Sequence, residues 1–425
     1  QDGVDHKVRV QQAGTEQSAY SKQDNGSGSG GNLAFIEQMG MIVPASGVQN
    51  AADVIQSGDL NQSTTLQGGD YNSAVTKQGQ KNDASSYNKG FIQQGMLGHS
   101  SAEDNIAKLE QDGADNQGLI YQTYDTNEAW TIQEGERNNS YVRQMNTAHD
   151  MMGHYAYTKQ IGADNNNKIH QDDDAGEINW AWAYQTGDAN ESFQTQLNTG
   201  LAGSGYVNYA LVDQGAFQDG IITSAGLADL QALDFNTIEK LANLSKLTSG
   251  SLAFQTQEGE DLDAETHQYG KDSYSEQTGS GNDAFVAQDS HGDTGHYARQ
   301  DQDGTNSFAT LGQFGNGNKA WQRQLDDDNI IVSSQLGHNN KLNTYQDGDG
   351  NRGNTVQHGK DNIALLTQKG GHSYTIMQHG HGNQADVLQL NPTGDFTLDY
   401  VPFSFDSALP APVMNNIPDL VIPDL

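Results

Sequence analysis

Glutamine recurs every eleven residues along much of this chain, and this spacing limits the possible folds more than any other feature. From Gln302 to Gln368 every eleventh residue is glutamine, and asparagine follows most of these glutamines by five residues. The unit Q-x-G-x-x-N-x-A-x-x-x-Q recurs from about Gln12 to Gln389, with some irregular copies. Such a repeat indicates stacked copies, because a stack buries a core that one copy could not.

Each unit has a constant part and a variable part. The step from Asn to the next Gln stays at six residues, as in Asn32 to Gln38, whereas extra residues fall between Gln and the next Asn. Within the constant part, Asn329–Gln335 for example, amide, aliphatic and small side chains alternate with variable ones. Alternation with a period of two predicts a strand with one buried face. Glycine two residues after Gln predicts a turn with a positive φ.

These patterns predict an all-β chain that folds as a β-solenoid of stacked strand-turn-strand repeats. Two eleven-residue units would make a coil of about 22 residues, and about fifteen coils would form a rod roughly 70 Å long at ~4.8 Å per coil. The solenoid is expected to span residues 1–390. It would contain an inserted helical segment at about 220–250, where leucine and isoleucine recur at near-helical spacing up to Gly250. Residues 391–425 form a proline-rich, extended C-terminal tail in this prediction.

The repeated amides are expected to form ladders inside the solenoid. An amide at the same place in every coil finds partners above and below, whereas a buried amide without partners is costly. The residues assigned to this structural ladder are Gln313, Asn318, Gln324, Asn329, Gln335, Asn340, Gln346, Asn351, Gln357, Asn362, Gln368, Asn383 and Gln389.

The composition excludes several classes of function. A formal net charge of −34 argues against binding nucleic acid or an anionic membrane surface. The absence of cysteine excludes disulfides and thiolate metal sites. No apolar run approaches the ~20 residues of a membrane span, so no membrane insertion is expected. Because the chain starts at Gln1 without Met, we interpret it as a secreted protein whose signal peptide has been removed.

No group of residues predicts catalysis or a metal centre. Known catalytic motifs are missing, so we expect no enzyme activity, no catalytic residue and no cofactor. The acidic runs Asp172–Asp174 and Asp326–Asp328 are interpreted as solvated turns, with calcium binding as the minor alternative. His372, His379 and His381 lie close together in sequence without a legible tetrahedral set, so no metal site is assigned.

Three aromatic residues, Trp180, Trp182 and Tyr184, have the outward parity of their strand. They would form either a stripe that binds sugar or a neighbouring fibre, or a patch packed under a loop or insert. The sequence leaves both alternatives open.

The repeat resembles the curlin repeat of curli, the functional amyloid fibres of bacterial biofilms. The segments "NKAWQRQLDDDNIIVSSQ" (318–335) and "NDAFVAQ" (282–288) carry the motif nearly unaltered. The resemblance implies a structural subunit of a secreted, self-polymerising extracellular fibre that contributes to biofilm matrix or surface adhesion. The implied partners are further copies of the chain, a nucleator subunit and an outer-membrane secretion pore.

The alternative is a monomeric cell-surface β-solenoid, an adhesin or binding module capped by its C-terminal tail. Apolar side chains of the tail would either cover the chain's own last coil or dock on a neighbouring subunit as a donor strand. The exposed strand edges of an uncapped solenoid favour the neighbour. The residues assigned to this intersubunit contact are Phe396, Tyr400, Phe403, Phe405, Ile417, Leu420, Ile422 and Leu425.

Overall fold

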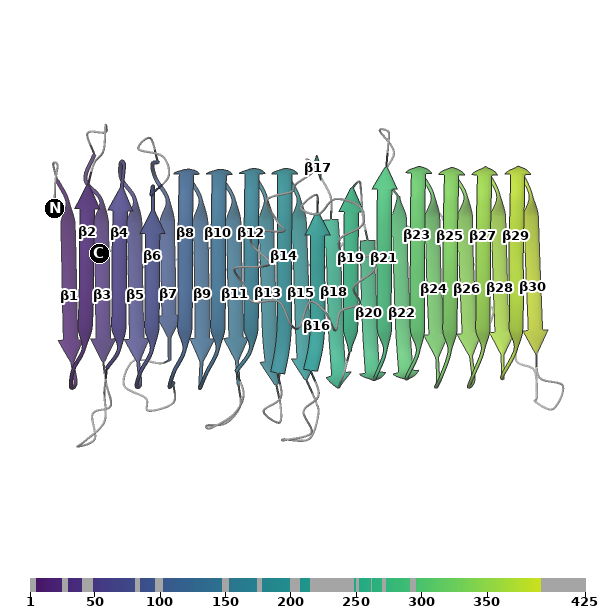
Figure 1. Ribbon diagram of the computed structural model, residues 1–425, viewed down its shortest axis with the longest axis horizontal. Coiled ribbons are helices and arrows are strands. Elements are labelled where there is room, and N and C mark those ends of the chain that lie inside the picture. Colours follow the sequence, from purple (N-terminus) through teal and green to yellow (C-terminus); the bar gives the residue numbers. More distant parts are fainter. Residues whose placement is uncertain are drawn as a thin grey trace.

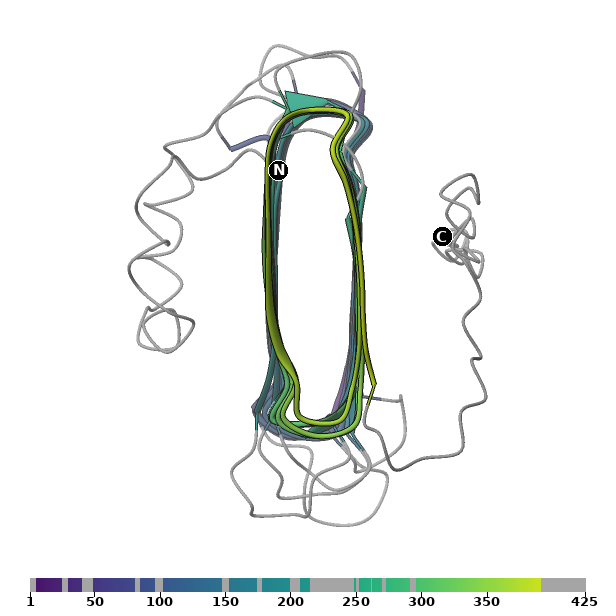
Figure 2. The same cartoon turned by 90° about the vertical axis from the view of Figure 1, so that its right-hand side faces the viewer.

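The computed structural model describes residues 5–24, 30–39, 49–80, 85–95, 102–146, 153–173, 178–198, 207–214, 248–249, 252–260, 262–269, 273–290 and 296–390. These residues form a rod of two parallel β-sheets that face each other, and the chain passes from one sheet to the other at every turn (Figure 1). Viewed along the rod, each coil is a long, flattened loop (Figure 2). The predicted all-β solenoid is therefore confirmed.

The first sheet, sheet A, runs β2-β4-β6-β8-β10-β12-β14-β16-β19-β21-β23-β25-β27-β29. Its strands are β2 (Ser18–Asp24), β4 (Ala51–Ser57), β6 (Ser73–Gln78), β8 (Ile106–Ala114), β10 (Glu128–Glu136), β12 (Tyr155–Ala163), β14 (Ile178–Asp188), β16 (Val207–Gln214), β19 (Asp263–Tyr269), β21 (Asp283–Ser290), β23 (Phe308–Asn316), β25 (Ile330–His338), β27 (Arg352–Lys360) and β29 (Ser373–His381).

The second sheet, sheet B, has fifteen strands in the order β1-β3-β5-β7-β9-β11-β13-β15-β18-β20-β22-β24-β26-β28-β30. They are β1 (Lys7–Ala13), β3 (Leu33–Met39), β5 (Gln62–Gly68), β7 (Lys89–Gln94), β9 (Gln117–Thr123), β11 (Asn139–Met145), β13 (Asn166–Asp173), β15 (Glu191–Asn198), β18 (Leu252–Glu260), β20 (Ser273–Ser280), β22 (Tyr297–Thr305), β24 (Lys319–Leu325), β26 (Lys341–Asp347), β28 (Ile363–Lys369) and β30 (Gln384–Leu390).

Burial alternates along the strands as the sequence predicts. In β26 the inward Leu342, Thr344 and Gln346 are buried, and the outward residues between them are only half-buried. Ala, Val, Ile and Leu from both sheets meet between them, as in the cluster around Leu109, Ile120 and Val142. Apolar burial thus holds the two sheets together, while backbone hydrogen bonds join successive coils.

Coil length varies while the register of the strands does not. Gln313 pairs with Gln335 across 22 residues, whereas Gln78 pairs with Gln111 across 33 residues. Glutamine still faces glutamine in both cases. The extra residues therefore lie in the turns, as predicted, and leave the ladder intact.

The turns depend on left-handed backbone at two places. The residue before the ladder asparagine has a positive φ, as in Asp328 (56°) and Asp361 (54°). The glycine two residues after Gln also has a positive φ, which is 118° at Gly337. A β-carbon added at Gly337 would lie 2.0 Å from the carbonyl oxygen of Gly359. Glycine is required here because of both the backbone conformation and the close approach of the next coil.

Two predicted segments fall largely outside the described residues. Of the helical segment at about 220–250, only Thr248 and Ser249 are described. They form the short strand β17 (Thr248–Ser249), which pairs with Gly187 and Asp188 of β14. The prediction that the helix continues to Gly250 is therefore wrong for these two residues, because their backbone pairs with a strand. The tail at 391–425 and its eight predicted docking residues lie wholly outside the described residues.

Candidate assembly site: the amide ladders and the end coils

Ladder glutamines of the interior coils, such as Gln335, have a hydrogen-bond partner on both sides along the rod. Gln335 Nε2 donates to Gln357 Oε1 at 2.8 Å, and its Oε1 accepts from Gln313 Nε2 at 2.7 Å. The second Nε2 proton goes to the backbone oxygen of Lys319, at 3.1 Å. Gln335 is completely buried. The network satisfies a polar side chain that would otherwise be costly to bury.

The same bond joins glutamines along both sheets. In sheet B, Gln302, Gln324, Gln346, Gln368 and Gln389 are linked at 2.9, 3.1, 2.9 and 2.9 Å. The donor is always the earlier coil and the acceptor the later coil. Because the remaining Nε2 proton is held by a backbone carbonyl, the amides cannot reverse without losing a bond. The glutamine ladder is therefore directional.

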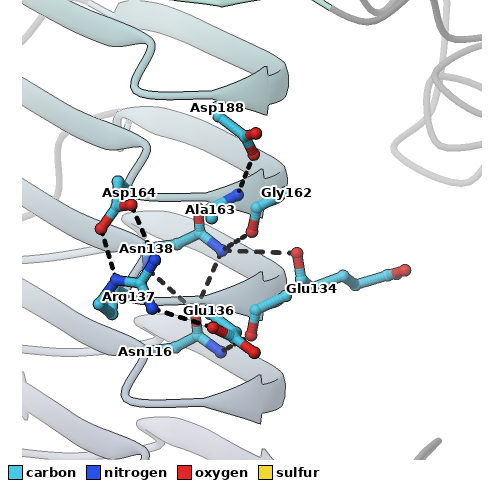
Figure 3. Close-up of polar contacts among 10 residues, drawn as sticks. Asn116, Glu134, Glu136, Arg137, Asn138, Gly162, Ala163, Asp164 and Asp188 are labelled. Atoms are coloured by element: carbon cyan, nitrogen blue, oxygen red, sulfur yellow. Dashed lines mark hydrogen bonds and ion pairs between the residues drawn. The ribbon is translucent and has the colours of Figure 1, made fainter.

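The asparagine ladder runs in the opposite direction. Asn340 donates its backbone N–H and its Nδ2 to Asn318 Oδ1, at 3.0 and 3.1 Å, and its own Oδ1 accepts from Asn362 at 3.1 and 3.0 Å. Figure 3 shows an equivalent step, in which Asn138 donates to Asn116 Oδ1 and its Nδ2 also reaches the carbonyl oxygen of Gly162 at 2.9 Å. Asparagine thus joins the turns of neighbouring coils.

All thirteen residues assigned to the ladder from sequence lie at inward positions and make ladder bonds. Eleven are buried at the end of a strand or turn, and two, Asn383 and Gln389, are partly exposed in the last coil. The eleven are Gln313, Asn318, Gln324, Asn329, Gln335, Asn340, Gln346, Asn351, Gln357, Asn362 and Gln368.

Histidine takes the place of asparagine in some coils, which the sequence analysis missed. His154 donates its backbone N–H to Asn127 Oδ1 at 3.0 Å, and its Nδ1 accepts from the backbone N–H of Asn179 at 3.2 Å. His296 Nδ1 likewise accepts from the backbone of Asn318 at 3.2 Å. The signal was present, because His154 precedes Gln160 by the same six residues that separate Asn from Gln elsewhere.

Burial keeps His154 neutral. Desolvation in the coil interior lowers the pKa of His154 to about 4, with a smaller lowering from His170 and an opposing contribution from the hydrogen bond to the carbonyl oxygen of Met145. Its Nε2 lies 3.2 Å from that oxygen, so the ring donates at Nε2 and accepts at Nδ1. A charged imidazole would lose the acceptor that Asn179 uses.

Asp125 and Lys159 are buried, whereas the other charged side chains that the structure describes are exposed or half-buried. Arg137 lies in a turn and binds Asp164 of the next coil through two hydrogen bonds, of 2.7 and 2.9 Å, and Glu136 through a third (Figure 3). The guanidinium holds the pKa of Asp164 below its usual value. Such exposed pairs contribute little stability, so the ladder and the apolar core carry the cohesion between coils.

The two end coils leave ladder groups without partners. Gln12 Nε2 donates to Gln38 at 2.7 Å, but its Oε1 has no partner among the described residues. At the other end, Gln389 accepts from Gln368, and neither Gln389 Nε2 nor Asn383 Oδ1 has a partner in the described chain. One end thus offers a glutamine acceptor, and the other offers a glutamine donor and an asparagine acceptor.

The end coils also expose core positions. Inward Val10 of β1 is 43% exposed and inward Tyr374 of β29 is 41% exposed, although Ile36, which pairs with Val10, is fully buried. No described segment covers either end of the rod. Unpaired strands with an apolar, amide-bearing end are surfaces on which another chain can add strands.

The acidic turn at Asp326–Asp328 uses its carboxylates within the rod. Asp327 Oδ1 accepts the backbone N–H of Thr305 at 2.9 Å, and Asp326 Oδ2 accepts that of Gly348 at 3.0 Å. Asp172 and Asp173 lie at the end of β13, and Asp174 lies outside the described residues. Among the residues described, no three histidine or acidic side chains are grouped to hold a metal ion.

The three C-terminal histidines are not brought together. His379 packs edge-on against His358 of the previous coil, with ring centroids 4.6 Å apart. His381 lies 3.6 Å from an Asp361 carboxylate oxygen, and His372 takes an asparagine position in the turn before β29. Each histidine thus has a different environment.

The aromatic residues of β14 do not form an open stripe. Trp182 and Tyr184 are 2% and 1% exposed despite their outward parity, and Tyr157 of β12 is fully buried beside Tyr184, with ring centroids 5.5 Å apart. This burial favours the packing alternative over a free sugar-binding surface.

No protein-family model matches the chain, and no curated protein matches it. None of the described residues lies in a helix long and apolar enough to cross a membrane.

Proposed function

We propose that this chain is the structural subunit of a secreted, curli-like extracellular fibre that grows by end-to-end stacking of solenoids. The fibre would contribute to biofilm matrix or surface adhesion, as the resemblance of the repeat to the curlin repeat implies. The resemblance also implies a nucleator subunit and an outer-membrane secretion pore as partners. Calcium at the acidic turns stays a minor part of the proposal.

The complementarity of the two end coils carries this proposal. Gln12 Oε1, an acceptor at the β1 end, matches Gln389 Nε2, a donor at the β30 end. Stacking the β30 end of one copy on the β1 end of another would continue the glutamine ladder in its own direction. Two identical ends would oppose acceptor to acceptor or donor to donor, so contact between unlike ends is favoured.

Blocking one end at a time tests the proposal. Val10→Lys places a charge in the exposed core of the first coil, and Val387→Lys does the same in β30 of the last coil, where Val387 packs partly buried. The matched controls, Gln11→Lys and Gln384→Lys, are outward on the same two strands. Electron microscopy should show filaments from the wild type and both controls, and none from either end variant.

Mixing the two end variants makes the test sharper. Each keeps one working end, so an equimolar mixture should form dimers and stop, as measured by analytical ultracentrifugation. Dimers from one variant alone would indicate contact between like ends and contradict the proposed polarity. Discrete rods of wild-type protein under all conditions would favour the monomeric cell-surface adhesin capped by residues 391–425.

A further inference from the structure

An apolar surface lies on the outside of sheet A near the end of the rod. Five of the thirteen exposed large apolar side chains of the described residues lie there, 38 to 77% exposed. They are Phe308, Phe314, Val332, Leu336 and Met377. Register places Phe314 beside Leu336, and Val356 beside Met377. We call the outward side of β23, β25, β27 and β29 the acid-free face.

The charge of this face differs from that of the whole chain. The four strands FATLGQFGN, IIVSSQLGH, RGNTVQHGK and SYTIMQHGH contain no aspartate or glutamate, although the chain has 55 acidic residues. Arg352, Lys360 and the histidines His358 and His379 lie on them. An exposed apolar patch with cations and no acids is suited to an apolar, acidic partner.

Residues 391–425 have the complementary chemistry. This segment has no lysine, arginine or histidine, and its acidic residues are Asp395, Asp399, Asp406, Asp419 and Asp424. It is also rich in Phe, Leu, Val and Ile, which the rest of this polar chain is not. The apolar side chains of this segment therefore match the apolar side chains of the face, and its aspartates match the cations of the face.

The described chain also ends near the side of the rod where the strands of the acid-free face begin. Leu390 at the end of β30 pairs with Lys369 at the end of β28, and the chain enters β29 at Ser373 only four residues after Lys369. Leu390 therefore ends just before the point where a further strand of sheet A would begin. In a neighbour stacked on this end, the same face would start about eleven coils, or roughly 50 Å, further away.

We infer that residues 391–425 dock on the acid-free face of their own chain, across β23 to β29. The short tether gives the chain's own tail a higher effective concentration at this face than the tail of a second copy. The sequence alone favoured a neighbouring subunit as the acceptor, and the position of the face favours the same chain. This inference does not depend on the proposed function, because it concerns a single chain.

Photo-cross-linking of the full chain tests the docking. A benzophenone amino acid replaces Tyr400 or Phe405, and mass spectrometry maps the cross-linked peptides in a mixture of unlabelled and ¹⁵N-labelled protein. We expect cross-links to β23–β29, at least tenfold more often within one isotopic chain than between chains. Cross-links mainly between chains, or mainly to other strands, would overturn the inference.

Surface variants separate docking from general loss of structure. Val332→Asp with Leu336→Asp adds two like charges to the face, and Arg352→Glu reverses its cation without removing apolar area. Leu365→Asp with Leu388→Asp is the matched control on the outward side of sheet B, where Leu388 is 51% exposed. Both face variants should reduce the cross-links at least tenfold while the control retains them. Unchanged cross-links in both face variants would contradict docking on this face.

Discussion

At the scale of single residues, the amide does what no charged or apolar side chain could do at the same place. Gln346 donates to Gln368 and to the carbonyl oxygen of Ile330 while it accepts from Gln324. A lysine or glutamate there would stack like charges every ~4.8 Å, and an aliphatic residue would leave three partners unsatisfied.

Removing ladder amides should therefore cost much more than changing the outer surface. Gln335→Leu or Gln346→Leu should lower the free energy of unfolding by ~1–3 kcal/mol for each polar group left without a partner. The same change at outward Lys341 or Asn343 should have a small effect. Urea denaturation of the four variants measures the difference, and equal losses would mean that the amides do not hold the coils together.

His154 should make stability depend on pH. The folded pKa is about 4, below the value of about 6.5 expected in the unfolded chain, so the unfolded state binds more protons between these values. The free energy of unfolding is thus retained above pH ~6.5 and lost as the pH falls towards 4. Between pH 7 and pH 5, His154→Asn should reduce the loss in the free energy of unfolding by about 2 kcal/mol.

Denaturant midpoints at the two pH values measure this effect, with the exposed His358→Asn as the control. His170, whose pKa burial also lowers to about 4, remains in both variants and leaves a residual pH dependence. If His154→Asn kept the full wild-type dependence, His154 would not be its source.

At the scale of elements, the strand is uniform and the turn absorbs variation. Six residues from Asn to Gln keep the inward side chains in register, and the turn accepts insertions that lengthen the coil from 22 to 33 residues. The turn nevertheless has one rigid point. Consecutive glycines such as Gly337 and Gly359 lie so close that a β-carbon on one would overlap the next coil.

Two glycines of neighbouring turns should therefore respond differently to alanine. Gly337→Ala meets both a left-handed backbone and an atom at 2.0 Å, whereas Gly350, with φ 71°, has no atom within 4 Å of the added carbon. Gly350→Ala should cost ~1 kcal/mol from the backbone alone, and Gly337→Ala clearly more. Comparable thermal midpoints for the two variants would show that the close approach between coils relaxes freely.

At the scale of the whole molecule, hydrogen bonds hold the coils together along the rod axis, whereas negative charge on the sides of the rod repels other copies. The two sheets extend along the rod (Figure 1) and the amide ladders join successive coils, while the net charge of −34 makes copies repel one another. This combination favours growth at the ends, where hydrogen bonds are available, over lateral association.

Fibre growth should accordingly quicken with salt, and as the pH falls towards the pI of about 4.4. Thioflavin fluorescence or light scattering gives the rate at each ionic strength. Calcium chloride should accelerate growth more than sodium chloride of equal ionic strength only if the acidic turns bind calcium. In that case Asp327→Asn should remove the additional acceleration. Growth rates that change with neither salt nor pH would argue against electrostatic control of fibre growth.

The repeat in the sequence is enough to predict the strand, the two faces of each strand, the coil and the positions of the ladder amides. It is enough because a stack gives every coil the same neighbours, so the repeat Asn329–Gln335 carries the same constraints as any other. The period of two within the strand then decides which side chains point inward. Even the position of His154 is visible in the sequence once the six-residue step to Gln160 is noticed.

Other features depend on which coils become neighbours, and these are visible only in the folded rod. The opposite directions of the two ladders depend on backbone carbonyls of other strands, such as that of Lys319 in β24, which accepts from Gln335 in β25. The burial of Trp182 and the acid-free face around Leu336 depend on outward side chains, which the repeat leaves free to vary. These outward side chains lie beside residues of neighbouring coils, such as Phe314 beside Leu336 and Met377 beside Val356, and a local pattern holds no information about such contacts.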